Sequence, residues 1–292
     1  MKPGMLSDPA DPPDLERRFG GLARLYGAAG AQRIRQAHVV VVGLGGVGSW
    51  AAEAAARSGV ARLTLVDLDH IAESNINRQV HALDNTLGMA KVHAMRERIL
   101  HINPDCVVDC IEEFVDTENW PRVLGFGSNF DWNIVSVIDA CDQVKAKTAM
   151  AAWAINNQAR LISVGAAGGK RLAHKVDIED LSLVTHDPLL AQMRNRLRKE
   201  HGAARDKKRI GVACVFSCET VMRPAAVAAA GLVAPRETVD TLQPVDSASD
   251  FSSALPNDAT LNCHGYGSVV TVTSTFGLCA AGWVLDKIAE RL

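Results

Sequence analysis

The sequence predicts an α/β fold: a doubly wound, mainly parallel, Rossmann-like sheet with a smaller C-terminal extension. Short, continuously apolar runs alternate with helical segments, which is the pattern of buried parallel strands covered by helices on both faces. The first run meets the glycine cluster GLGGVGS at 43–49, where a tight turn passes into a helix. The second run ends on Asp67, 19 residues after Gly48, where a βαβ unit places an acid against ribose hydroxyls.

The same alternation sets the order of the expected elements. They are a helix at 15–35, strands at 39–42 and 63–66 on either side of the glycine turn and its helix, a helix at 87–103, a strand at 106–111, a short helix at 117–124, and a strand, helix and strand at 133–140, 144–157 and 160–165. Beyond residue 170 the pattern loosens into a strand at 174–178, a helix at 188–201 and a strand at 210–216.

These elements suggest a division of the chain into three parts. Residues 1–14 are rich in proline and are expected to form a disordered leader. Residues 15–170 form the expected nucleotide-binding domain. Residues 171–292 form a C-terminal region that binds substrate and completes a dimer, with a mobile loop at 232–258.

The composition is that of a folded protein without a strong excess of either charge. The chain has 292 residues, 48% of them hydrophobic, and a formal net charge of -2. This content is ample for a full core, and the charge excludes a chain that coats nucleic acid by bulk charge, although local basic patches are compatible with it. Seven scattered cysteines and no recognisable signal peptide suggest reduced thiols and a cytoplasmic location.

One uncharged apolar run, at 266–285, is long enough to be weighed as a membrane span. Its hydroxyl side chains and three glycines make it a weak span. We expect a helix that is buried or faces a dimer partner, and no stable membrane insertion.

Polar residues follow three of the predicted strands, at ends that a parallel sheet brings to one edge. The glycine turn offers main-chain N–H groups to a phosphate, and the loop after the second strand carries Asn75 and Arg78, followed by Lys91. Two cations are more positive charge than a dinucleotide pyrophosphate needs, and they suit a triphosphate under attack. Asp139 and Asp142, at the end of the third of these strands, are spaced to hold Mg²⁺ beside the phosphates.

Other functions use the same glycine turn. An NAD-dependent oxidoreductase would leave Arg78, Lys91 and Asp142 without a clear task. A scaffold that binds ATP without turnover is a non-catalytic alternative, and an ordinary surface salt-bridge network would account for the two cations alone.

The combined motifs resemble the adenylation domain of the ThiF/MoeB/HesA family and the ubiquitin-activating enzymes. They are GLGGVGS, the D-x-D of 67–69, S-N-x-N-R-Q at 74–79, the lysine of GMAK at 88–91, INP at 102–104 and D-x-x-D at 139–142. The resemblance implies a carboxylate that attacks the α-phosphate of ATP, giving an acyl-adenylate and pyrophosphate. It also implies that an arginine near the N-terminus reaches into the partner subunit's site in a homodimer. Arg18 and Arg24 both fit, and we include Arg24 among the catalytic candidates.

The residue roles that the resemblance implies can be stated together. The nucleotide contacts are Gly43, Gly45, Gly46, Gly48, Asp67, Asp69, Asn75 and Asp139, the groups that act on the triphosphate are Arg78 and Lys91, and the Mg²⁺ ligand is Asp142.

Further motifs, at 18–27, 81–88, 211–217 and 273–277, resemble the members of this family that act on tRNA. They imply that the activated carboxylate belongs to the threonylcarbamoyl side chain of adenosine 37, and that ring closure with loss of water follows. An internal nucleophile needs no protein thiol. The alternative is adenylation of the C-terminus of a ubiquitin-like sulfur carrier, and a sulfur-transfer protein is a possible partner.

A basic segment offers a contact for tRNA. Residues 194–209 carry eight cations against two acids, which suits a sequence-independent, salt-sensitive phosphate contact, although a charged face kept for solubility has the same composition.

The cysteines give little support to a zinc site. The close pairs, 106/110 and 214/218, are C-x-x-x-C rather than C-x-x-C, and core burial explains the first pair better than metal ligation. Cys263 is the best thiol candidate if a covalent step exists, and an incidental cysteine is the simpler interpretation.

Overall fold

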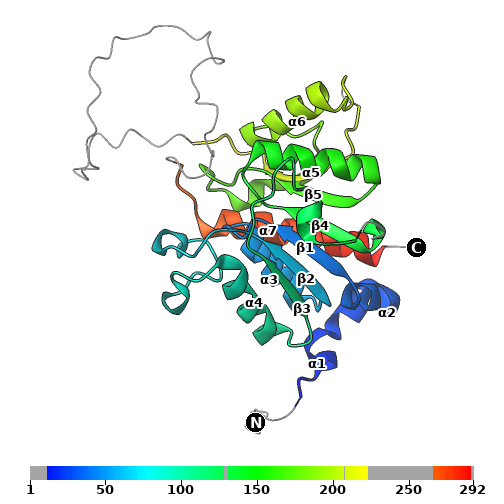
Figure 1. Cartoon of the computed structure of the whole chain (residues 1–292), viewed down its shortest axis with the longest axis vertical. Helices are drawn as coiled ribbons and strands as arrows, with labels where there is room; N and C mark the ends of the chain where they lie inside the picture. The colour runs from blue at the N-terminus through cyan, green and yellow to red at the C-terminus, as the bar shows by residue number, and fades with distance from the viewer. Residues whose placement is uncertain (1–11, 128–130, 207, 223–265, 291–292) are drawn as a thin grey trace, which may run out of the picture.

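The computed structural model describes residues 12–127, 131–206, 208–222 and 266–290. Within these residues the chain forms one seven-stranded sheet in the order β3-β2-β1-β4-β5-β7-β6 (Figure 1). The strands are β1 (His38–Val42), β2 (Arg62–Val66), β3 (Val107–Ile111), β4 (Val135–Asp139), β5 (Arg160–Val164), β6 (Val176–Asp180) and β7 (Ala213–Ser217). Every neighbouring pair is parallel except β6 with β7. The doubly wound, mainly parallel α/β fold is therefore confirmed.

Helices cover both faces of the sheet. They are α1 (Leu15–Phe19), α2 (Gly21–Arg35), α3 (Gly48–Arg57), α4 (Lys91–Ile102), α5 (Val144–Asn157), α6 (Pro188–Glu200) and α7 (Val270–Ala289). One apolar core joins the sheet to α2, α3, α4 and α7, and a second joins it to α5 and α6. The result is a three-layer sandwich with α3, α4 and α7 on one side of the sheet and α5 and α6 on the other (Figure 1).

Most predicted elements are found within a few residues of their expected bounds, and two differ in kind. The single helix expected at 15–35 is interrupted at Gly20, and Gly27 inside α2 has a φ of 71°. The short helix expected at 117–124 is wrong: only a 3₁₀ turn, Arg122–Leu124, forms there. Pro121 precedes that turn, and proline removes a helical donor and restricts the residue before it.

The sheet continues across residue 170. β7 pairs with β5 and carries β6 at its other edge, so strands from both sides of that position share one sheet. Helix α7, from the far end of the chain, packs on the same core as α3 and the first strands. The division at residue 170 therefore does not separate two cores, and its functional meaning stays a prediction.

Helix α7 approaches α3 closely through Gly277. A Cβ at Gly277 would lie 2.3 Å from the Val47 carbonyl oxygen, so a larger residue would push the helices apart. Val272, Phe276 and Ala280 of α7 are fully buried. The buried helix expected in this region is thus present, and in the described part of the chain no helix is both long and apolar enough to cross a membrane.

The strand order reverses between β1 and β4, which is where this fold opens a crevice at the carboxyl ends of the strands. Val42, the last residue of β1, is paired with Val66 on one side and Asp139 on the other. The loops that follow these three residues are the ones that carry the predicted site.

Candidate functional site

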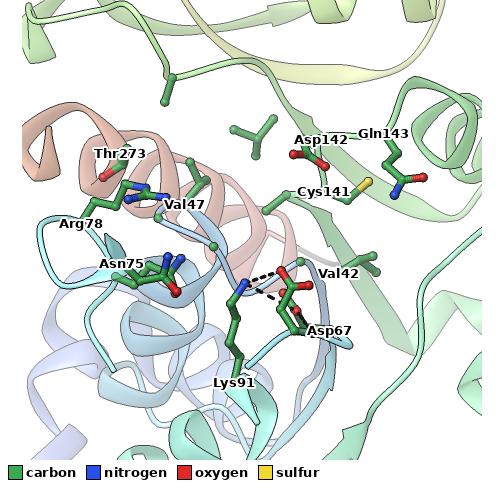
Figure 2. Close-up of a pocket in the computed structure, with 18 of the residues that line it drawn as sticks. Val42, Val47, Asp67, Asn75, Arg78, Lys91, Cys141, Asp142, Gln143 and Thr273 are labelled. Atoms are coloured by element: carbon green, nitrogen blue, oxygen red, sulfur yellow. Dashed lines mark hydrogen bonds and ion pairs between the residues drawn. The ribbon is translucent and has the colours of Figure 1, made fainter. Parts of the chain in front are cut away.

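A cavity of about 360 Å³ lies at this crevice, large enough for a small-molecule ligand or cofactor. Its walls come from segments far apart in the sequence: the glycine turn, the loops after β2, β3, β4 and β5, and the start of α7. Figure 2 shows side chains from these segments gathered around one space. Among the predicted site residues, the cavity lining includes Gly43, Gly45, Gly46, Asp67, Asp69, Asn75, Arg78, Lys91 and Asp142.

The glycine turn adopts a shape that side chains would prevent. Gly43 has a φ of 86°, and a Cβ there would lie 2.9 Å from the Ala140 carbonyl oxygen. A Cβ at Gly48, the first residue of α3, would lie 1.7 Å from the Gly43 carbonyl oxygen. A Cβ at Gly45 would meet nothing within 4 Å, so this part of the turn is open. The turn therefore presents its main chain to the cavity at a helix N-terminus, which suits an anion.

Asp67, Asp69 and Lys91 form a charged cluster beside the turn. The Lys91 ammonium lies 2.6 Å from an Asp69 carboxylate oxygen and 3.8 Å from one of Asp67 (Figure 2). Asp67 also accepts the N–H groups of Leu44 and Asp69, so it fixes the turn as well as lining the cavity. Burial raises the pKa of the Asp67 carboxyl, although the Lys91 charge and the two N–H donors act in the opposite direction.

Arg78 and Asn75 come from the loop after β2. The Arg78 guanidinium donates to the Ser74 carbonyl at 2.7 Å and to the Asn77 side chain at 2.9 Å. Its aliphatic stem packs on Gly46, where a Cβ would lie 3.0 Å from Arg78 Cγ. Asn75 accepts the N–H of Ala72 at 3.0 Å. The loop is thus ordered by its own hydrogen bonds, and its Arg78 and Asn75 line the cavity together with Lys91 (Figure 2).

The two aspartates after β4 do not share one role. Asp142 lines the cavity and is partly exposed, whereas Asp139 is fully buried and absent from the lining. One Asp139 carboxylate oxygen lies 2.9 Å from the Lys147 ammonium and accepts the Ser163 hydroxyl at 2.6 Å. The structure therefore corrects the expectation that Asp139 faces the nucleotide: it anchors the turn that carries Asp142.

The donor set fits a magnesium ion held mainly by phosphate. Mg²⁺ is usually bound by one or two carboxylates together with phosphate oxygens and water. In the described residues no group of three or more His, Cys, Asp and Glu is placed to hold a metal without such a ligand. Asp142 is the carboxylate available on the far side of the cavity from Asp67 (Figure 2).

The described cysteines are free thiols, and five of them have raised pKa values. Burial raises the pKa of Cys106 and Cys110 to about 11, and it raises the pKa of Cys141 and Cys214 well above the usual value. Thiols of this kind are poor nucleophiles and poor metal ligands. Cys263 and the loop at 232–258 lie outside the described residues.

Several predicted contacts lie away from the cavity. Arg24 is exposed on α2, and Arg18 donates to the Ile102 carbonyl at 2.8 Å, so neither reaches the site of its own chain. A role in a partner's site stays a prediction for both.

The basic segment 194–209 lies at the opposite edge of the sheet from the cavity. It ends just before Ala213, the first residue of β7, whereas the cavity is at the carboxyl ends of the strands. Several of its cations are engaged internally: Arg194 donates to the Val184 carbonyl at 2.8 Å and Arg198 to the Ala204 carbonyl at 3.1 Å. Arg205 donates to the Arg198 carbonyl at 3.3 Å, and Arg196 lies 3.9 Å from a Glu200 carboxylate oxygen. Fewer charges are therefore free for tRNA than the sequence suggested.

The cavity lining includes residues that the sequence did not single out as site residues, among them Phe114, Gln143, Tyr266 and Thr273. Phe114 is 53% exposed although it is a large apolar side chain, and it follows β3. Thr273 is in the first turn of α7 and lies beside Arg78 (Figure 2). Only the fold brings α7 to a turn more than 200 residues earlier, so the motif at 273–277 does not by itself place Thr273 at the cavity.

His81, beneath the loop after β2, makes stability depend on pH. It is 1% exposed, and neither ring nitrogen has a hydrogen-bond partner among the described residues. Burial, and then the Lys91 and Arg98 charges, lower its pKa to about 4. The ring is therefore neutral in the folded protein, while the unfolded chain takes up a proton below about pH 6.5.

We accordingly expect His81 to lower the free energy of unfolding as the pH falls from about 6.5 toward 4, by at most about 1.4 kcal/mol per pH unit. The His81→Leu variant should lose about 2 kcal/mol less stability than the parent between pH 7 and pH 5. Urea unfolding at the two pH values measures this difference. Equal losses in the two proteins would contradict the assignment, and His38, whose pKa is also lowered to about 4, contributes equally to both.

Comparison with known proteins agrees with this geometry. A model of the ThiF family matches residues 18–291. The chain is 37% identical over 280 residues to a tRNA threonylcarbamoyladenosine dehydratase of Haemophilus influenzae, covering 95% of each chain. It is 38% identical over 276 residues to the Escherichia coli protein of the same name, covering 94% of each. Its fold is similar to the crystal structure of the Escherichia coli enzyme TcdA in complex with ATP, with a TM-score of 0.75 and 36% identity, covering 94% of this chain and 96% of that one.

Proposed function

The chain belongs to the ThiF family, and we propose that it is an ATP-dependent enzyme that removes water from threonylcarbamoyladenosine in tRNA. The observation that carries this proposal is the single cavity in which the glycine turn, Arg78, Lys91 and Asp142 meet. Relatives of nearly the same length carry this activity in their names. Crystal structures of the Escherichia coli relative contain ATP in one case and AMP in another.

The chemistry begins with a carboxylate that is a poor electrophile until it is activated. A carboxylate oxygen of the threonylcarbamoyl group attacks the α-phosphorus of ATP, the bond to pyrophosphate breaks, and an acyl-adenylate forms. A nucleophile within the same side chain then attacks the activated carbonyl and AMP leaves. The ring closes with net loss of one water, and the tethered nucleophile has a high effective concentration.

The residues of this chain have distinct tasks in that step. The N–H groups of the glycine turn and the start of α3 bind phosphate oxygens. Lys91 and Arg78, which both line the cavity, neutralise charge that moves toward the departing pyrophosphate. Asp142 would hold Mg²⁺ against the phosphates, where the ion would offset their charge. Asp67 and Asp69, which line the cavity, would bind the ribose.

Two features favour tRNA over the C-terminus of a ubiquitin-like sulfur carrier as the activated partner. The relatives that align with nearly the whole of this chain are named as tRNA threonylcarbamoyladenosine dehydratases. A relative named as an adenylyltransferase and sulfurtransferase aligns with 34% of this chain. Ring closure also needs no protein thiol, and the described thiols have raised pKa values where a shift is resolved. We also propose a homodimer, a cytoplasmic location and a sulfur-transfer protein as a partner, all of which are compatible with this function.

Incubation of the protein with ATP, Mg²⁺ and threonylcarbamoylated tRNA tests the function. Mass spectrometry of the released nucleosides should show a loss of about 18 mass units, one water, from the modified adenosine. Reactions without ATP, or with tRNA that lacks the threonylcarbamoyl group, are the controls and should show no loss. AMP release only when a ubiquitin-like carrier is added, with the nucleoside unchanged, would transfer the assignment to the alternative.

A further inference from the structure

The mouth of the cavity has opposite charge on its two sides. The segment after β3, at 112–118, carries four carboxylates and no cation, and Glu113 lines the cavity. The segment at 171–175, just beyond the turn that follows β5, carries Arg171, His174 and Lys175 and no acid. All three of these side chains are exposed. An approaching polyanion is therefore repelled from one side and attracted to the other.

The pairing of β6 with β7 places the 171–175 segment at the same edge of the sheet as the cavity. β6 is antiparallel, so its first residue, Val176, is paired with Ser217, the last residue of β7. Gly165, Ala167 and Gly168 of the preceding turn line the cavity itself. Three positions along the chain separate this wall from Arg171.

The segment is held firmly in this place. The buried Lys170 ammonium donates to the Ser217 carbonyl at 2.9 Å and to the His186 carbonyl at 3.2 Å. Glu219 accepts the N–H groups of Arg171 and Leu172, both at distances near 2.9 Å. At the other end, the Lys175 carbonyl accepts the N–H of Cys218 at 3.1 Å.

This anchoring leaves Arg171 and Lys175 exposed and without an ion pair in the described residues, although the Arg171 charge helps to lower the pKa of the Glu219 carboxyl. The Lys170 ammonium is buried and bound to main-chain carbonyl groups. Arg171 and Lys175, in contrast, form no ion pair with any acid in the described ranges. The nearby Glu219 carboxylate is already bound to main-chain donors. A preordered pair of free cations loses less conformational entropy on binding than cations on a loose loop.

We propose that Arg171, His174 and Lys175, here called the basic rim, bind backbone phosphates of the RNA chain on either side of the nucleotide that enters the cavity. This inference rests on the proposed function, which makes tRNA the substrate. The contact is electrostatic and independent of base sequence, and it sets the side of the cavity along which the RNA strand lies. It replaces segment 194–209, at the opposite edge of the sheet, as the main contact close to the reacting group.

Two matched charge reversals test the basic rim. The double variant Arg171→Glu/Lys175→Glu changes the rim, and Lys208→Glu/Arg209→Glu makes the same change in charge in segment 194–209, also at exposed positions. The affinity for threonylcarbamoylated tRNA is measured by fluorescence anisotropy over a series of KCl concentrations. The rim variant should bind at least ten-fold more weakly at low salt, and its slope of log K against log salt should fall by about 1.4, the loss of two phosphate contacts on a single strand. The matched variant should bind tRNA like the parent.

Affinity for ATP without tRNA should be unchanged in both variants, which shows that each is folded. If charge reversal disturbs the fold, the milder Arg171→Gln/Lys175→Gln variant replaces it. This variant should show the same change in the slope of log K against log salt. Unchanged tRNA affinity in the rim variants, or a loss confined to Lys208→Glu/Arg209→Glu, would overturn the inference while dehydration by the parent protein still supports the function. Conversely, the unsubstituted protein could bind tRNA through the basic rim and yet remove no water from the nucleoside. That result would refute the proposed function and still support the basic rim as an RNA-binding surface.

Discussion

The Lys91→Met variant is expected to lose ATP-dependent adenylate formation by a factor of about 10²–10³, the usual effect of removing one preorganised donor from a developing negative charge. Lys91 is 5% exposed and lines the cavity with Asp67 and Asp69, so a partly desolvated ammonium lies where the triphosphate is proposed to bind. Pyrophosphate release in the presence of ATP, Mg²⁺ and modified tRNA measures the loss. The Asp142→Asn variant should show a similar loss, and its apparent affinity for Mg²⁺ should fall as well.

The fold should survive the change at Lys91. Asp67 keeps the N–H donors of Leu44 and Asp69, and its raised pKa allows it to take up a proton when the ammonium is gone. The matched control is Lys145→Met, because Lys145 is an exposed lysine near the start of α5 that does not line the cavity. Full activity in Lys91→Met, or an equal loss in the control, would contradict the triphosphate role.

The sequence was most informative where chemistry and local structure depend on the same residues. The glycine turn needs its glycines for a positive φ at Gly43 and for close contact at Gly48, so the pattern that predicts a phosphate site also predicts the turn. Strands β1, β2 and β4 are continuous apolar runs, and they were placed within three residues of their bounds. Their carboxyl ends then converge by topology, which is why the sequence alone assigns Asp67, Arg78 and Asp142 to one cavity.

The sequence failed where a side chain's direction decides its role. Asp139 and Asp142 look equivalent in a D-x-x-D motif, yet Asp139 belongs to the strand and points into the protein while Asp142 follows it. The same limit applies to the basic segment, because Arg194 and Arg198 donate hydrogen bonds to main-chain carbonyl groups that only the fold brings near. The contact between Thr273 and Gly46 joins distant parts of the chain, so the motif at 273–277 could be recognised while its place at the cavity could not.

The buried Asp139–Lys147 pair gives a second large expected effect. Both side chains are fully buried, with the ammonium 2.9 Å from the carboxylate. Burial is the largest single influence and lowers the pKa of Lys147, but the Asp139 charge and hydrogen bond, together with Cys141 and Cys214, raise that pKa by more. Asp139 also accepts the N–H of Cys141, one position before Asp142. The pair therefore holds the turn that carries Asp142, the proposed metal ligand.

Lys147→Met should lower the free energy of unfolding by about 3–5 kcal/mol, because it leaves the Asp139 charge buried without a partner. The double variant Asp139→Asn/Lys147→Met removes both charges and keeps an acceptor for the Ser163 hydroxyl, so it should recover more than half of that loss. Urea unfolding measures both values. Ser136→Ala is the matched control, since Ser136 is a buried polar residue of the same strand whose hydroxyl has no partner in the described residues, and it should cost little.

Stability and positioning can be separated in the double variant. If the pair only stabilises the fold, the double variant should bind Mg²⁺ and ATP like the parent once its stability returns. Because the ammonium also donates to the Asp139 carbonyl at 3.2 Å, we expect instead faster hydrogen–deuterium exchange at residues 140–143 and weaker Mg²⁺ binding in the ATP complex. Exchange and metal affinity equal to the parent's would limit the pair to a structural role, whereas the expected changes would make it the support on which the Asp142 turn depends.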